Sequence, residues 1–266
     1  MLFAILIPKS WSKATQMFIG IAVEQWIRYA LFAGIAWLLA YVLFKKHWWR
    51  RKIIQRDPLP SDVRREMKWS ALTALVYGLG GTATILLGKL GGMQFYRKIE
   101  THGWLWFGCS IVIAIVVHDT YFYWTHRLMH HRRLFRWFHR VHHESTNPSP
   151  WAAYSFGPLE AVVQVGIFPL LAFTLPMHPL AFLIFMIFQI AFNVAGHTGY
   201  EYGPRWLMKS WLGKFINTPT NHVQHHEKMR GNYGLYFNIW DRLMGTNHRD
   251  YESRFHEVTT RPHTRS

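Results

Sequence analysis

About the first 200 residues alternate between long apolar segments and short polar stretches. A helix needs about 20 mostly apolar residues to cross the hydrocarbon core of a bilayer. Segments close to that length occupy about residues 20–44, 69–89, 104–124, 156–175 and 179–197. The pattern therefore predicts an all-α integral membrane protein with four to five transmembrane helices.

The polar stretches between these segments indicate how the helices connect. DPLPSD, at residues 57–62, is a stop signal followed by a new helix start. PMHP, at residues 176–179, predicts a tight reversal, so the last two apolar segments form a hairpin. The apolar patch at residues 1–8 is too short to span a bilayer and is expected to lie in the interface. We expect residues 1–266 to form a single membrane domain, with a polar and aromatic C-terminal part that begins at His197.

Charge predicts the orientation of the helices. The chain holds 30 Lys and Arg against 14 Asp and Glu, a net charge of +16 that a nucleic-acid-binding protein could also have. Here the basic residues flank the apolar segments, which is typical of cytoplasmic loops of membrane proteins, so we expect no nucleic-acid partner. If all five segments cross the membrane, placing residues 45–68 in the cytoplasm also places 126–155 and 197–266 there, with 24 of the 30 basic residues. We therefore expect a cytoplasmic cap, in a bacterial inner membrane rather than the endoplasmic reticulum.

Histidine is the residue type that stands out in this cap. The stretch at residues 118–143, HDTYFYWTHRLMHHRRLFRWFHRVHH, holds an H-x-x-x-H and an H-x-x-H-H motif, and a second H-x-x-H-H motif lies at residues 222–226. Residues three and four apart are neighbours on a helix surface, so imidazoles from one motif can reach the same metal ion. The single cysteine, Cys109, excludes a disulfide framework and a thiolate-rich metal site. The three motifs predict a polyhistidine metal centre.

Eight motif histidines and the histidine that ends the last apolar segment are the candidate metal ligands: His126, His130, His139, His142, His143, His197, His222, His225 and His226. Further candidates, as ligands or as groups that hold ligands, are His118, Asp119, Glu144, Glu201, Glu227 and Asp241. The carboxylates are included because metal-bound imidazoles usually donate their other N–H to such groups. We expect ordinary surface or core roles for His47, His102, His131, His178, His248, His256 and His263.

The number of candidate ligands indicates two metal ions. A zinc ion takes three or four protein ligands, so nine are too many for one ion and suit two, with positions left for oxygen. Imidazole binds iron, zinc, copper and nickel. A dimetal site beside lipid, with an apolar interior behind it, fits oxidation of an unactivated C–H bond in a hydrophobic substrate. The alternative is a metal transporter or metal sensor, although transporters usually place their polar ligands near the bilayer midplane.

The residues around the histidines carry a resemblance to a known family. The matching segments are FYWTHRLMH (122–130), FHRVHHES (138–145), GHTGYE (196–201), NTPTNHVQHHE (217–227) and NYGLYFNIWDRLMGT (232–246). Over roughly residues 105–250 the chain resembles the sterol desaturase and fatty acid hydroxylase superfamily of integral-membrane di-iron enzymes. The resemblance implies that the eight motif histidines occupy iron-ligand positions and that His197 matches an additional family histidine, with no catalytic residue beyond the ligands. The position of His118 varies in that family.

The resemblance also implies a reaction and its partners. Such enzymes use two iron ions, O2 and two external electrons to hydroxylate or desaturate a lipid, here a sterol, an acyl chain or a related molecule. The chain holds no flavin, haem or iron–sulfur motif, so we expect a separate electron donor, such as a ferredoxin or a small haem protein with its reductase. An acidic donor would be attracted by arginines beside the motifs, and anionic lipid headgroups are the alternative partner. These arginines are Arg127, Arg132, Arg133, Arg136 and Arg140.

Overall fold

The computed structural model describes residues 12–262, so the apolar patch at residues 1–8 lies outside the described range. Apart from isolated β-bridges, the regular secondary structure of this range is helical. Four helical segments are long and apolar enough to cross a membrane: α1 (Lys13–Trp37) continued by the π-helical η2 (Leu38–Leu43), α3 (Pro60–Gly88), α4 (Gly103–Met129) and α9 (Pro179–His197). The predicted all-α membrane architecture is confirmed.

Shorter helices make up the rest of the described chain. Near the ends of the long helices lie α2 (Lys45–Trp48), η3 (Trp49–Arg51), η4 (Ile99–Thr101), α5 (Phe135–Phe138) and α6 (Arg140–His143). Between α6 and α9 lie η5 (Pro150–Tyr154), α7 (Pro158–Val165) and α8 (Ile167–Thr174). After α9 follow η6 (Leu207–Lys209), η7 (Gly213–Phe215), α10 (Pro219–Lys228), α11 (Ile239–Leu243) and α12 (Tyr251–Thr260).

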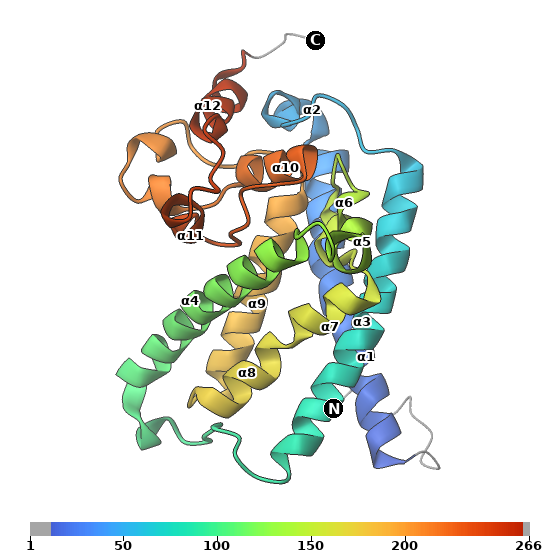
Figure 1. The fold of residues 1–266 in the computed structure, drawn as a ribbon, viewed down its shortest axis with the longest axis vertical. Helices are drawn as coiled ribbons and strands as arrows, with labels where there is room; N and C mark the ends of the chain where they lie inside the picture. The colour runs from blue at the N-terminus through green and yellow to red at the C-terminus, as the bar shows by residue number, and fades with distance from the viewer. Residues whose placement is uncertain (1–11, 263–266) are drawn as a thin grey trace.

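The long helices form a bundle that carries its polar cap at one end. Figure 1 shows α2, α10 and α12 gathered above the bundle, with α5 and α6 beneath them at the upper end of α4. The connections before α4 and between α8 and α9 lie at the opposite end. Within the bundle α1 and α3 approach closely, because a Cβ added at Gly78 would lie 2.7 Å from the Cβ of Ala22. Because α4 ends at the cap and α6 and α10 lie in it, all three histidine motifs meet at the same end of the bundle.

The apolar segment at residues 156–175 differs from the other spans. It forms two short helices, α7 and α8, that join at Gly166 and cover residues 158–174, fewer than the roughly 20 residues that a span needs. Figure 1 shows α7 beginning part-way down the bundle. The reason is that η5, which precedes α7, is itself buried among α1, α3 and α9.

Polar side chains of the long helices fix this buried 3-10 helix, η5. The hydroxyls of Tyr29 and Ser70 donate to the carbonyl of Trp151 at 2.6 and 3.0 Å, and the amide of Asn193 donates to the carbonyl of Ala153 at 2.9 Å. Irregular backbone at membrane depth is tolerated only where protein satisfies its polar groups. The polar residues within the spans therefore hold η5 in the bundle, and this places the start of α7 directly below the cap.

Candidate metal centre

Nine histidines converge at the cap in two adjacent groups. The first group contains His126, His130, His139, His143 and His225, and the second contains His142, His197, His222 and His226. Within each group one ring nitrogen per residue lies within 4.8 Å of the others. The structure thus brings together the eight motif histidines and His197, the nine predicted ligands.

Helical spacing decides which group a histidine joins. Each pair spaced four apart stays in one group: His126 with His130, His139 with His143, and His222 with His226. The third member of each H-x-x-H-H motif, His142 or His225, belongs to the other group. The segment at α6 and the helix α10 therefore each serve both groups, whereas α4 serves only the first and α9 only the second.

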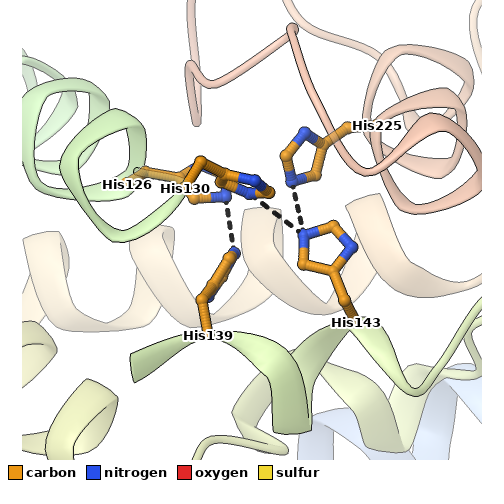
Figure 2. Close-up of side chains that lie close together, drawn as sticks. All are labelled: His126, His130, His139, His143 and His225. Atoms are coloured by element: carbon orange, nitrogen blue, oxygen red, sulfur yellow. Dashed lines mark hydrogen bonds between the residues drawn. The ribbon is translucent and has the colours of Figure 1, made fainter. Parts of the chain in front are cut away.

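Figure 2 shows the five-histidine group, with its rings directed at a common centre from three segments of the chain. Nε2 of His126 lies 2.8 Å from Nε2 of His139. Nε2 of His143 lies 3.1 Å from Nε2 of His130 and 2.9 Å from Nε2 of His225. In a six-coordinate ion with bonds of about 2.1 Å, neighbouring nitrogens at right angles are about 3.0 Å apart. The Nε2 atoms of this group therefore have the spacing expected for ligands of a single metal ion.

The four-histidine group has the same spacing. Nε2 of His197 lies 2.8 Å from Nε2 of His222 and 3.3 Å from Nε2 of His142. Nε2 of His226 lies 3.2 Å from Nε2 of His222. Two groups with equivalent spacing fit one metal ion each.

The hydrogen bonds made by Nδ1, the ring nitrogen that faces away from the centre of the group, decide the tautomer of each imidazole. Nδ1 of His126 lies 2.8 Å from the carbonyl oxygen of Tyr233, and Nδ1 of His139 lies 2.7 Å from a carboxylate oxygen of Glu160. The Tyr233 carbonyl can only accept and a neutral imidazole has only one N–H, so His126 donates from Nδ1 and keeps a lone pair on Nε2. His139 does the same when Glu160 is ionised, although burial raises the pKa of Glu160 well above its ordinary value. With Glu160 ionised, the two lone pairs face each other at 2.8 Å. A bound cation would stabilise this arrangement.

Two more histidines are fixed in the same tautomer. His225 donates from Nδ1 to the carbonyl of Gly231 at 2.6 Å, and His197 donates from Nδ1 to the carbonyl of Asn193 at 2.8 Å. Their Nε2 atoms are therefore free to bind a metal. Both groups contain nitrogen atoms that are prepared as ligands by the surrounding backbone.

Burial keeps the imidazoles of the cap neutral. Burial, followed by the neighbouring imidazoles, lowers the pKa of His130 to about 2. Burial is also the largest cause that holds the pKa well below its ordinary value for His139, His142, His143, His222, His225 and His226. Neutral imidazole is the form that binds a metal, so the site needs no deprotonation near neutral pH.

The carboxylates expected beside the ligands take other positions. Asp241 accepts hydrogen bonds from the backbone N–H of Tyr233 and Gly234 at 2.8 and 2.7 Å, and Asp119 accepts from the N–H of Tyr236 at 2.7 Å. These bonds fix the loop whose Tyr233 carbonyl receives His126. Asp119 and Asp241 therefore act on the loop and do not contact the rings.

The three predicted glutamates also bond to groups other than the histidine rings. Glu201 accepts from the backbone N–H of Thr220 at 3.0 Å, in the first turn of α10, which carries three of the ligands. Glu144 and Glu227 pair with arginines at the edge of the cap. Among the described residues, none of the five predicted carboxylates is hydrogen-bonded to a histidine of either group. Proximity in the sequence therefore predicted carboxylates close to the site, but none that is hydrogen-bonded to a histidine ligand.

Glu160 on α7 is the carboxylate that does contact a ligand, and sequence reasoning missed it. It is fully buried and accepts from Nδ1 of His139. Its position inside the apolar segment 156–175 was the available signal, because a lone ionisable residue in such a run usually has a functional partner.

The remaining histidines lie apart from the two groups. His118 belongs to neither group, and its Nδ1 lies 2.8 Å from the hydroxyl of Tyr236. The isolated histidines also lie outside them: His47, His102, His131, His178, His248 and His256. His263 falls outside the described residues.

The fold and the site define a helical membrane protein with a polyhistidine centre at one end of its bundle. A family model described as fatty acid hydroxylase matches residues 111–246, a range that includes all nine histidines. The chain belongs to the fatty acid hydroxylase family, and the predicted superfamily is confirmed. No solved structure matches the chain.

Several curated relatives are sterol-modifying proteins. The chain is similar to a Delta(7)-sterol 5(6)-desaturase of Gibberella zeae (29% identity, 71% of this chain and 57% of the relative) and to one of Aspergillus fumigatus (30%, 71% and 63%). It is also similar to lathosterol oxidase of Mus musculus (28%, 71% and 62%). The match thus spans about three-fifths of the length of these relatives.

We predict that Glu160→Gln weakens iron binding about tenfold or more, because the loss of the carboxylate charge weakens the hold on the His139 ring. The measurement is iron affinity by chelator competition on folded protein in detergent. Glu144→Gln, at the edge of the cap, is the matched control and should retain wild-type affinity. Equal affinity in folded Glu160→Gln and wild-type protein would contradict the role of Glu160.

Proposed function

We propose that this protein is a membrane-bound di-iron oxidoreductase that hydroxylates or desaturates a lipid with O2 and two external electrons. The observation that carries the proposal is the pair of histidine groups, whose Nε2 atoms converge at the cap end of an apolar bundle. Nitrogen donors at near right-angle spacing suit iron, and groups of five and four ligands leave coordination positions open. Two iron ions bound there would supply the activation of dioxygen that oxidation of an unactivated C–H bond requires.

The residues of the chain have three tasks in this reaction. The nine imidazoles hold the ions, and four of the rings are oriented by a group bound to Nδ1: those of His126, His139, His197 and His225. Burial of the ligands excludes bulk water from the site. No catalytic side chain beyond the ligands is part of the proposal.

A sterol is the substrate class that we propose. The relatives named above are sterol desaturases and a lathosterol oxidase, and the similarity to each covers 71% of this chain. Because the match spans only about three-fifths of those relatives, the substrate, the electron donor and the choice between hydroxylation and desaturation belong to the proposal. The single-domain organisation belongs to it as well.

A metal transporter or sensor is the weaker alternative. Transporters bind their ions near the bilayer midplane, at the interface between repeats. Here the ligands lie at one end of the bundle and are tied to backbone carbonyls and to Glu160. Two tightly held ions after purification in detergent would support the enzyme, and one freely exchanging ion would support the alternative.

We place the cap in the cytoplasm. Residues 45–68, 126–155 and 197–262 hold 23 of the 30 Lys and Arg, and these segments lie at the cap end. A bacterial inner membrane is the proposed location.

The function is tested by two single substitutions in the ligand set. His142→Ala and His225→Ala, one from each group, should reduce oxidation of a Δ7-sterol by more than the 10–100-fold loss that is typical for residues that only orient a ligand. The measurement is product formation by purified, iron-loaded protein with a chemical or enzymatic electron supply. His256→Ala, on the exposed side of α12, is the control and should keep wild-type turnover. Comparable turnover in all three variants would refute the site.

The electron donor is proposed to dock on the loop between His130 and His139. Arg132, Arg133 and Arg136 are exposed there, and the Arg136 guanidinium lies 4.5 Å from the ring centre of an exposed tryptophan. This loop gives the shortest path along the chain from the surface to two ligands of the first group. Arg127 is less available, because it is half-buried and donates to the hydroxyl of a tyrosine.

We predict that the double reversal Arg132→Glu/Arg133→Glu lowers the donor-dependent rate about tenfold at low salt, with an acidic ferredoxin below saturation as donor. The assay uses detergent without anionic lipid, which removes the contribution of headgroups. Lys89→Glu/Lys98→Glu reverses the same number of charges at the opposite end of the bundle and should leave the rate unchanged. A rate that is insensitive to salt and to the Arg132/Arg133 reversal would exclude this docking surface.

A further inference from the structure

A small buried space lies on the bundle side of the metal centre. It has a volume of about 20 Å³, enough for one water-sized group, and His118, Gln164, Gln189 and Asn193 line it together with aromatic rings. Gln164 is one helical turn beyond Glu160 on α7, and Asn193 is one turn before a ligand at the end of α9. The space is therefore next to the site where oxidation is proposed to occur.

The amide of Gln164 has an unused hydrogen-bond donor in this space. Gln164 is 6% exposed, and its Nε2 atom has no hydrogen-bond partner among the described residues. The two other amides of the space are occupied, since Gln189 donates to the hydroxyl of Tyr154 at 3.0 Å and Asn193 donates to the carbonyl of Ala153 at 2.9 Å. A buried donor without a partner is unfavourable, so Gln164 is suited to an acceptor that a ligand supplies.

A larger, mainly apolar cavity shares the lining residue Phe168 with the small space. It has a volume of about 620 Å³, within the usual range for small-molecule sites, and lies between α1, α3, α8 and α9. Apolar residues such as Ile85, Leu183 and Met186 dominate its wall. Phe168 lines both the cavity and the small space and is the one residue that the two linings share.

We propose that Gln164 determines substrate specificity by donating a hydrogen bond to an oxygen atom of the lipid. The hydrocarbon body then extends past Phe168 into the 620 Å³ cavity. In this position the oxidised C–H bond lies within a few bonds of an oxygen-bearing carbon, as in ring oxidation of a 3-hydroxysterol. The middle of an unsubstituted acyl chain does not meet this requirement. The inference rests on the proposed lipid oxidation and adds how the substrate is selected.

The test compares ligands that differ at one oxygen. Metal-loaded protein in detergent, without O2 or an electron donor, is titrated with a Δ7-sterol, its 3-ketone and its 3-deoxy analogue in competition with a radiolabelled sterol. Wild-type protein should bind the alcohol and the ketone about tenfold more tightly than the deoxy analogue. The ketone tests the direction of the bond, because it only accepts. Equal binding of all three ligands would overturn the inference without using any variant.

The variants separate Gln164 from general effects on binding. Gln164→Met, similar in shape but without the amide, should reduce the tenfold preference to about one. Gln94→Met, an exposed glutamine in the loop before α4, should keep the preference. Leu183→Trp, which fills the cavity, should weaken all three ligands and keep their ratio. A full preference in folded Gln164→Met would overturn the role of Gln164, whereas failure of wild-type protein to oxidise any lipid is a separate result that would refute the proposed function.

Discussion

Facing lone pairs in a buried space are the constraint on which the rest of the cap depends. Nε2 of His126 and Nε2 of His139 lie 2.8 Å apart, and with Glu160 ionised both rings donate their only N–H in the opposite direction. Without a cation this arrangement is repulsive, and burial opposes the protonation that would relieve it. Metal binding and cap formation are therefore expected to stabilise each other, as in other sites whose ligands must be assembled by folding.

The chain maintains this arrangement with supports that do not touch the metal ligands directly. Polar residues in the spans hold η5, which places α7 and Glu160 beneath His139. Asp119 and Asp241 fix the loop that presents a carbonyl to a ligand on α4, and Glu201 caps the helix that carries three ligands. Most of the buried carboxylates near the site thus position backbone, and the backbone positions the rings.

Local periodicity made much of this predictable from sequence. The long apolar segments specify the spans, and spacing of three or four residues places histidines on one face of a helix. The partition of nine ligands into two groups follows from the same spacing once α6 and α10 pack together. Glu160 was not predictable in this way, because its partnership with His139 arises from tertiary packing between segments 21 residues apart. The shortened fourth segment, residues 156–175, depends on packing too, because the burial of η5 places the start of α7 part-way down the bundle.

The most direct test of the account is the location of metal in crystals of the iron-loaded protein, measured by anomalous scattering at the iron absorption edge. The account predicts two peaks per chain, each about 2.1 Å from Nε2 atoms. One peak should lie among the five histidines that include His126 and His139, and the other among the four that include His197 and His222. A single peak, or peaks outside these groups, would contradict the two-ion centre.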